Sequence, residues 1–235
     1  MVEVPVVRMP PMLGGQAASW AALIELTPIL GQNWLLVGGQ MVFLHELERE
    51  ALNVRPTDDV DVVLDLRAEP GALRRIHDAL RSAGFDQDRP SPEGTAHRYR
   101  RETALFDVLA PDNVGDRAQL HLGAGRTIEA PGTTQALRRS EVVQVDLDET
   151  SGLVRRPSLV GALLGKAAAV TKIASQTAAD RSKHLRDFDS LSMMLGPSDR
   201  QGAELTKSER RALQGLVDEP GLSKLAVASL NLLIQ

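Results

Sequence analysis

The chain has 235 residues, of which 43% are hydrophobic and 25% charged, so it can bury a sizeable core and is neither disordered nor fibrous. It has no cysteine, which excludes disulfides, thiolate nucleophiles and sulfur-ligated zinc and agrees with a reducing cytosol. The net charge of −4 excludes a uniformly basic nucleic-acid binder, so any nucleic-acid surface must be local.

The chain begins with a proline-rich arm, MVEVPVVRMPPMLGG. Its arginine and its two successive prolines interrupt the apolar stretch that a secretory signal needs. No apolar run of about 18 residues, the length that spans a bilayer, occurs further along the chain either. We therefore expect a cytoplasmic protein with no membrane partner.

Strands and helices alternate in the first part of the chain. Hydrophobic spacing predicts a helix over 16–30, and the run WLLVGG predicts a strand that turns at two glycines into a helix over 40–52. After a loop over 53–58, the valine-rich segment DVDVVLDL predicts a strand over 59–66. The other elements expected here are a helix over 70–82 and strands over 97–101, 104–109 and 142–147.

The pattern becomes almost wholly helical from residue 157 onward. It predicts helices over 158–174, 180–195, 206–217 and 222–233. We therefore expect two domains, an α/β domain with a mixed sheet over 1–152 and a helical domain over 153–235.

The strand predicted over 59–66 carries the first candidate site. A period of two places Asp59 and Asp61 on one face and Val60 and Val62 on the other. Carboxylates whose backbones lie about 7 Å apart repel each other in a cleft unless a cation lies between them, and Mg²⁺ prefers such oxygen ligands. The alternative is an acidic, solvent-exposed face of an edge strand.

Two further features surround this pair of carboxylates. Gly38 and Gly39 lie where a strand turns into a helix, so free amides and the positive helix end can meet phosphate oxygens. Asp107 lies within an apolar strand, where a carboxylate is costly unless it faces a cation or a donor. The alternatives are a simple tight turn for the glycines and an edge position facing water for Asp107.

The helical part adds a lysine and an acid. The helix around Lys166 is mostly apolar, so its amine is drawn toward a buried anion unless it reaches water from the helix edge. Asp187 and Asp189 face different directions on the next helix, so at most one of them points at Lys166. Residues 151–186 contain seven basic residues and one acidic residue, which predicts a local surface for triphosphate or RNA unless these charges are simply solvated.

Three segments, VGG, RPTDDVDVV and FDVL, resemble the pattern of the nucleotidyltransferase superfamily, in which a glycine turn precedes a Dx[DE] pair and a third carboxylate. RxTxDxD, LLGKAAA around Lys166 and KHLRDFDSL around Asp187 resemble more narrowly the AbiEii/MenT toxin nucleotidyltransferases. The chain departs from the pattern at Gln40, where many members have serine, and at His184, where an acidic residue is expected.

The resemblance implies an α+β fold, with a nucleotidyltransferase-like mixed β-sheet, flanking helices and a C-terminal helical bundle. It implies transfer of NMP from an NTP to an acceptor hydroxyl, with Mg²⁺ or Mn²⁺ as the cofactor. The implied metal ligands are Asp59, Asp61 and Asp107. The implied catalytic set adds Lys166 and Asp187 to these three. The implied nucleotide-binding residues are Gly38, Gly39, Arg55, Thr57 and Lys166.

The same resemblance implies the biological context. The expected acceptor is the 3′ end of a tRNA, and the expected role is that of a toxin with a cognate antitoxin. One alternative is a small-molecule nucleotidyltransferase of the antibiotic-modifying type, whose acceptor pocket should be acidic rather than basic. Another is a catalytically inactive member that binds nucleotide or RNA. The sequence leaves the identity of the NTP open.

Overall fold

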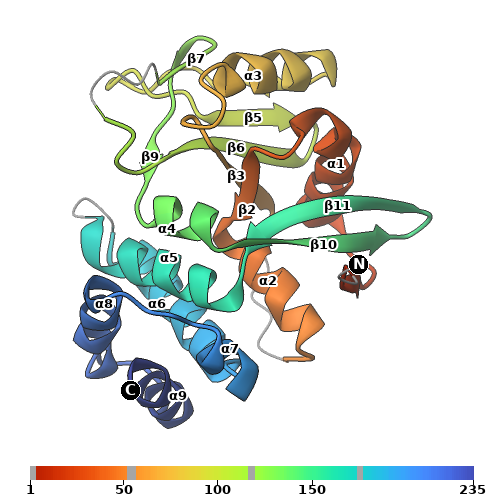
Figure 1. Ribbon diagram of the computed structural model, residues 1–235. Helices are drawn as coiled ribbons and strands as arrows, with labels where there is room; N and C mark the ends of the chain where they lie inside the picture. Colours follow the sequence, from red (N-terminus) through yellow and green to blue (C-terminus); the bar gives the residue numbers. More distant parts are fainter. Residues whose placement is uncertain (1–3, 52–56, 116–119, 174–176) are drawn as a thin grey trace.

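The computed structural model describes residues 4–51, 57–115, 120–173 and 177–235, which fold into a mixed α+β structure (Figure 1). Its largest sheet has the strand order β2-β3-β6-β5-β4, with β9 added beside β6. β3 pairs in parallel with β6, whereas β2, β5 and β4 pair antiparallel with their neighbours. The expected mixed sheet is confirmed. The strands are β2 (Trp34–Val37), β3 (Asp59–Leu64), β4 (Asp86–Gln87), β5 (Arg98–Arg101), β6 (Ala104–Pro111) and β9 (Glu129–Ala130).

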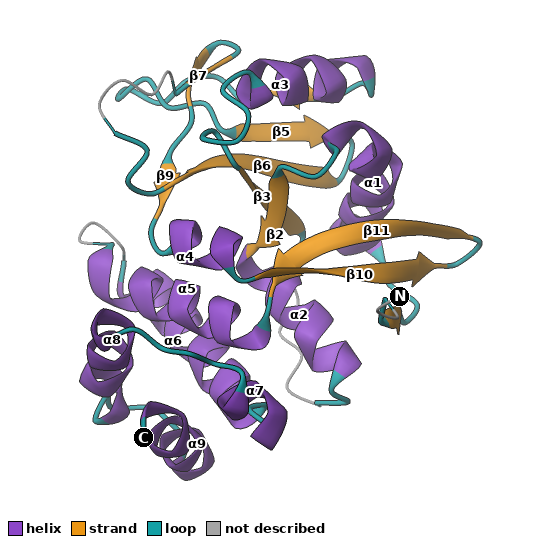
Figure 2. Cartoon of the chain, viewed as in Figure 1, coloured by secondary structure: helices purple, strands orange, loops and turns teal. Residues whose placement is uncertain are grey.

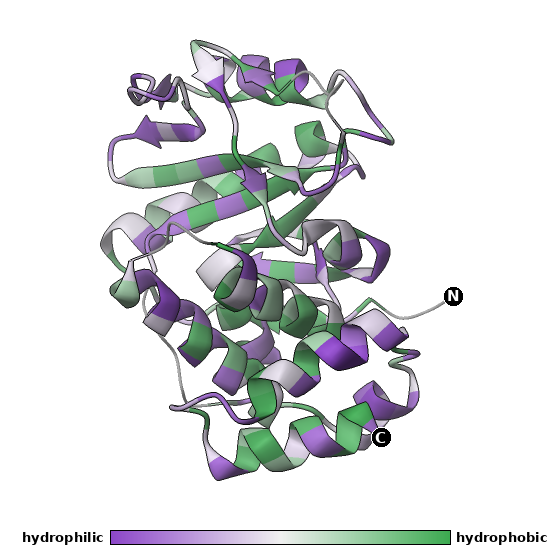
Figure 3. Cartoon of the chain, turned by 90° about the vertical axis from the view of Figure 1, so that its left-hand side faces the viewer, coloured by the Kyte–Doolittle hydropathy of each residue, from purple (hydrophilic) through white to green (hydrophobic). Residues whose placement is uncertain are grey.

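Helix α1 (Gly14–Leu30) packs against β3 and β6, and α3 (Ala72–Ser82) packs against α1. The residues that α1 buries recur at helical spacing, and they include Trp20, Leu23 and Leu26. The strands of the sheet carry long hydrophobic stretches (Figure 3). All four residues of β2 are buried, which is why WLLV reads as an unbroken apolar run rather than an alternating one.

A long hairpin extends the structure beside the sheet (Figure 2). It consists of β10 (Ser140–Leu147) and β11 (Thr150–Pro157), and β1 (Val6–Arg8) pairs in parallel with β10. The strand expected over 142–147 is therefore part of β10, whereas β11 was not predicted. The domain boundary expected after residue 152 falls inside β11, because Gly152 is a packing position in a strand rather than a break. A Cβ there would lie 2.8 Å from Thr27 Oγ1 of α1.

The helices beyond β11 form a bundle that contacts the sheet region through α2 (Gly38–Glu48). Helix α5 packs on α6 and α8, α6 packs on α9, and α2 packs on α5 and α6. Side chains of Ser158, Thr177, Thr206 and Ser223 cap the starts of α5, α6, α8 and α9. The bundle helices are α5 (Leu159–Lys172), α6 (Ala178–Met193), α7 (Pro197–Gln201), α8 (Lys207–Val217) and α9 (Lys224–Ile234).

Three short elements that follow β6 in the chain were not predicted. They are β7 (His121–Leu122) and β8 (Gly125–Arg126), which pair with each other beside α3, and α4 (Thr133–Arg138). Helix α4 packs against α5 and β11, so it joins the two parts of the molecule. One cluster of buried hydrophobic residues runs through both parts, from Trp20 in α1 to Leu230 in α9. In the described ranges, no helix combines the length and apolar character needed to cross a bilayer.

Candidate active site

The three predicted carboxylates lie together on one face of the sheet. β3 and β6 are in register with Asp61 opposite Asp107, and Asp59 lies two residues before Asp61 on the same face of β3. Ligand oxygens of all three side chains lie within 4.8 Å of one another. The three carboxylates that the resemblance implies as metal ligands therefore lie together, and we call these three residues the carboxylate cluster.

Asp61 is the most perturbed member of the carboxylate cluster. Burial, followed by the charges of Asp107 and Asp59, raises the pKa of Asp61 to about 8. Lys166 and Arg98 act in the opposite direction without cancelling these effects. The ionised cluster therefore needs additional positive charge.

An arginine that was not predicted neutralises part of the carboxylate cluster. Arg98 Nε donates to Asp107 Oδ1 at 2.7 Å, and Nη2 donates to Asp107 Oδ2 at 2.6 Å and to Asp59 Oδ2 at 3.1 Å. This bidentate arrangement is the strong form of an arginine–carboxylate pair. The signal was present in the sequence, because the two-residue turn at Glu102 and Thr103 pairs β5 with β6 and sets Arg98 opposite Asp107.

The negative charge that remains on the carboxylate cluster suits a hard divalent cation. Three carboxylates face one arginine, which leaves a net negative charge. Within the described ranges Asp61 accepts no hydrogen bond, while Asp59 Oδ1 accepts one from Thr57 at 2.7 Å. An all-oxygen, negatively charged donor set of this kind suits Mg²⁺ or Mn²⁺. Thr57 therefore orients Asp59 in this structure.

The glycine turn lies directly over Asp61. Gly38 has φ of +70° at the start of α2, and a Cβ at this position would overlap the Asp61 carboxylate. Only glycine satisfies both requirements. Val37 at the N-cap of α2 provides no side-chain acceptor for the first amides of the helix. Gly38 and Gly39 thus bring the positive end of α2 to the carboxylate cluster.

Lys166 and Asp187 form a buried pair between α5 and α6. Lys166 Nζ donates to Asp187 Oδ2 at 2.7 Å, and the two side chains are 7% and 5% exposed. Asp189 instead accepts a hydrogen bond from the Ser223 amide at 2.7 Å, so Asp187 is the partner of Lys166. This pair is an interhelical contact as well as part of the site wall.

Two cavities meet at the carboxylate cluster. A polar cleft of about 230 Å³ is lined by Gly38, Gly39, Asp59, Asp61, Lys166 and Lys183 among others. An apolar cavity of about 270 Å³ shares Gly38, Asp61 and Lys166 with that cleft and is otherwise lined mainly by aliphatic side chains. The site therefore has one compartment suited to charged groups and one suited to an uncharged group.

Gln40, next to the glycine turn, has a structural role in place of a nucleotide contact. Gln40, which stands where serine is common in the resembling pattern, is fully buried. Its side chain accepts a hydrogen bond from Trp20 Nε1 at 2.6 Å and donates one to the Thr57 carbonyl at 2.5 Å. Gln40 therefore fixes the chain before β3. Arg55, a predicted nucleotide-binding residue, lies outside the described residues.

Four of the seven basic residues over 151–186 form ion pairs with acids in the structure. These four pair with acids that mostly lie outside that range: Arg156 with Glu48 and Glu141, Arg181 with Glu219, Lys166 with Asp187 and Lys183 with Asp180. The charge count over 151–186 includes Asp180 but none of the other partners. The surface that these residues present is less positive than the sequence suggested.

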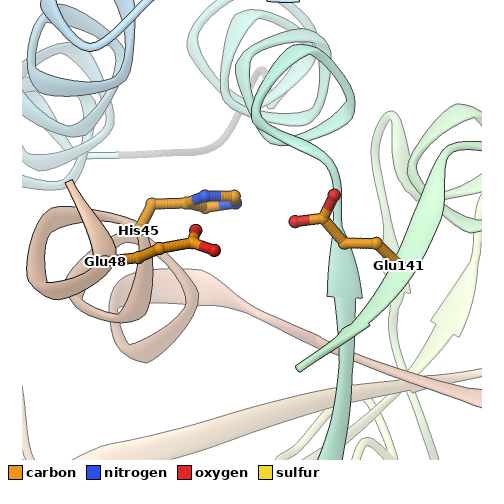
Figure 4. A group of neighbouring side chains, drawn as sticks. All are labelled: His45, Glu48 and Glu141. Atoms are coloured by element: carbon orange, nitrogen blue, oxygen red, sulfur yellow. The ribbon is translucent and has the colours of Figure 1, made fainter. Parts of the chain in front are cut away.

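A second cluster of metal-ligand types lies between α2 and β10 (Figure 4). Ligand atoms of His45, Glu48 and Glu141 also lie within 4.8 Å of one another. However, Arg156, only 1% exposed, already forms ion pairs with both glutamates. Burial and the charge of Arg156 lower the pKa of His45 well below its usual value, and His45 Nε2 lies 3.1 Å from the Pro157 carbonyl. This ion-pair cluster, in which His45 and Arg156 are buried and both glutamates are partly exposed, fastens the β10–β11 hairpin to α2.

Comparison of the chain with protein-family models, curated proteins and solved structures found no match. The function must therefore be argued from the geometry and chemistry of the site.

Proposed function

We propose that this protein is a metal-dependent nucleotidyltransferase with the fold of that superfamily, transferring NMP from an NTP to an acceptor hydroxyl. The observation that carries the proposal is the carboxylate cluster, in which Asp61 faces Asp107 across paired strands beneath the Gly38 turn. An acidic cluster beside free helix amides suits a phosphate chain accompanied by divalent cations.

The residues divide into four roles. Asp59, Asp61 and Asp107 would hold Mg²⁺ or Mn²⁺, which supplies the positive charge that stabilises the reacting phosphate. The amides of Gly38 and Gly39 would bind the terminal phosphates.

Lys166 would add positive charge at the wall of the polar cleft, and its pair with Asp187 holds the amine in place. Arg98 would hold Asp107 and Asp59 in fixed orientations through the three hydrogen bonds described above.

The reaction would proceed by direct displacement. The acceptor oxygen bonds to the α-phosphorus while the bond to the bridging oxygen breaks, and pyrophosphate leaves with the electron pair. The hydroxyl proton passes to a carboxylate of the cluster. We propose a tRNA 3′ end as the acceptor, and a toxin role with a cognate antitoxin, on the basis of the sequence resemblance.

The test is incubation of the purified protein with each labelled NTP, Mg²⁺ and total tRNA, followed by a gel. We expect label in tRNA with the wild type and background signal with Asp61→Asn, which removes an anionic ligand at almost unchanged volume. Asp58→Asn is the matched control, since Asp58 is exposed and outside the carboxylate cluster. Transfer by Asp61→Asn at the wild-type rate would contradict the proposal.

The same assay separates the alternatives. A small-molecule nucleotidyltransferase would leave tRNA unlabelled but transfer label to a hydroxyl compound such as an aminoglycoside. An inactive member would bind a nonhydrolysable NTP in calorimetry and label no acceptor. Either result would replace tRNA nucleotidyl transfer as the function.

A further inference from the structure

The apolar cavity lies between the central sheet and α5, and its lining includes Asp61 and Asp107. Val37 of β2 and Leu109 of β6 line it from the sheet, and Ile128 lines it from the segment that leads into β9. Its volume of about 270 Å³ is near the lower end of the range for small-molecule pockets. The cavity therefore suits one ring system with its sugar rather than a whole nucleoside triphosphate.

The wall provided by α5 consists of small residues. Gly161, Ala162, Gly165 and Ala169 all line the cavity and recur on one side of the helix. A Cβ added at Gly165 would meet no atom within 4 Å, so this position faces open space. A wall of backbone and methyl groups allows a flat ring to lie directly against the helix.

The lining of the cavity favours an uncharged occupant. Carboxylates line both cavities, Asp61 and Asp107 here and Asp59 and Asp61 in the polar cleft, so the other lining residues make the difference. Those of this cavity are mainly aliphatic, and burial among them would strip a phosphate of its hydration while it favours the apolar faces of a ring. His97 also lines the cavity.

The two cavities reach different members of the carboxylate cluster. Asp59 and Lys183 line the polar cleft, Asp107 lines the apolar cavity, and Asp61 lines both. In direct displacement at phosphorus the acceptor oxygen enters opposite the departing pyrophosphate. With the triphosphate in the polar cleft, the acceptor therefore approaches from the side of Asp107.

We propose, resting on the nucleotidyltransferase function above, that the apolar cavity holds the acceptor. Its occupant is the uncharged base and ribose of an unpaired terminal nucleoside, with the ribose hydroxyl directed toward the carboxylate cluster and the adjoining phosphates outside. The donor triphosphate stays in the polar cleft, so the two substrates occupy separate compartments that meet at Asp61.

The proposal is tested by a substitution on α5 that fills the cavity. Gly165→Leu places a side chain in the open space, and Gly215→Leu is the matched control. Gly215 is also helical, also has no atom within 4 Å of an added Cβ, and lies on α8 outside the cavity. Binding of each of the four free nucleosides is measured by NMR titration, binding of a nonhydrolysable NTP by calorimetry, and KM for total tRNA by label transfer.

We expect at least one nucleoside to bind the wild type in the presence of saturating NTP analogue. Gly165→Leu should weaken that binding and raise the KM for tRNA by about tenfold, about 1.4 kcal/mol, with unchanged NTP affinity. Gly215→Leu should change none of the three values. Ile128→Ser, which removes apolar lining at a position 38% exposed, should weaken nucleoside binding without depending on how a leucine fits on α5.

Three results would overturn the assignment. They are the absence of nucleoside binding to the wild type, displacement of the nucleoside by the NTP analogue, and a loss of NTP affinity in Gly165→Leu. The last two would assign the cavity to the donor base. A wild type that binds nucleoside in this cavity but transfers no label to any acceptor would contradict the nucleotidyltransferase function and support the cavity as a nucleoside site.

Discussion

The carboxylate cluster and the ion-pair cluster look alike when only their ligand atoms are compared. Each brings together three side chains of metal-binding type within 4.8 Å, and each contains an arginine paired with two acids. They lie on different elements, the first on β3 and β6 and the second on α2 and β10. The similarity shows that convergence of carboxylates is not enough to identify a metal site.

The difference lies in how far the arginine completes each cluster. Arg156 is 1% exposed and serves two glutamates, whereas Arg98 is 31% exposed and faces three aspartates. Asp61 is left without a hydrogen bond among the described residues and adjoins two cavities. The remaining negative charge on three carboxylates, and the space beside Asp61, distinguish the carboxylate cluster as the one that can accept a cation.

The largest predicted effect comes from removing the arginine that completes the ion-pair cluster. Arg156→Met leaves Glu48 and Glu141 with uncompensated charge, and we expect the free energy of unfolding to fall by about 3 kcal/mol. This value is at the low end for a broken buried pair because both glutamates are partly exposed. Urea denaturation measures the change.

Arg155→Met is the matched control for Arg156→Met. Arg155 is the adjacent residue of β11, and its guanidinium donates to Ser140 Oγ at 3.0 Å. We expect its loss to cost less than about 1 kcal/mol. Equal losses in the two variants would show that Arg156 does not hold the ion-pair cluster together.

The next prediction concerns divalent ions. If only the carboxylate cluster accepts a cation, Mn²⁺ or Mg²⁺ should raise the free energy of unfolding by about 2.7 kcal/mol at a hundred times Kd, and EDTA should reverse this. Asp61→Asn should abolish the effect, and Glu141→Gln should leave it intact. Thermal melts with and without the ion measure it. Loss of the effect in Glu141→Gln and its survival in Asp61→Asn would reverse the roles of the two clusters.

The fold was predictable where a pattern is local. The alternation in DVDVVL, the apolar run before Gly38 and the caps of the bundle helices each follow from neighbouring residues. β11 was missed because the change of pattern after Gly152 was interpreted as a domain boundary, which falls inside this strand. In the structure, Gly152 makes room for α1, and Arg156 is compensated by glutamates distant in sequence. Such compensation depends on tertiary contacts.

The site was predictable where strand alternation or the family resemblance identified a residue. Strand parity places Asp59 and Asp61 together, and the parallel pairing that adds Asp107 agrees with the expected convergence. The resemblance indicated Lys166 and Asp187, and α5 and α6 bring them together. Arg98 and the apolar cavity were missed. Hairpin register could have identified Arg98, whereas the cavity involves β2, β6, β9, α4 and α5 at once and has no local pattern.

The smallest predicted effect is a pH dependence of the ion-pair cluster. The lowered pKa of His45, caused by burial and by Arg156, means that the unfolded chain binds a proton below about pH 6.5 while the folded chain does not. Stability from His45 is therefore present above that pH and is lost as the pH falls, by at most about 1.4 kcal/mol per pH unit. His45→Gln removes the titration and keeps a donor for the Pro157 carbonyl.

In the protein without a bound cation, the carboxylate cluster changes the stability with pH in the direction opposite to His45. Because the pKa of Asp61 is raised to about 8, its contribution to stability is lost as the pH rises from about 4 to 8. The wild-type profile alone therefore cannot isolate His45, but the difference between wild type and His45→Gln can, since Asp61 is common to both.

Between pH 7 and pH 5, measured by urea denaturation, we expect the wild type to lose more stability than His45→Gln. His121→Gln, at an exposed histidine, should follow the wild type. Parallel profiles for wild type and His45→Gln would mean that His45 takes up its proton in the folded state, and that the ion-pair cluster has room for a second cation beside Arg156.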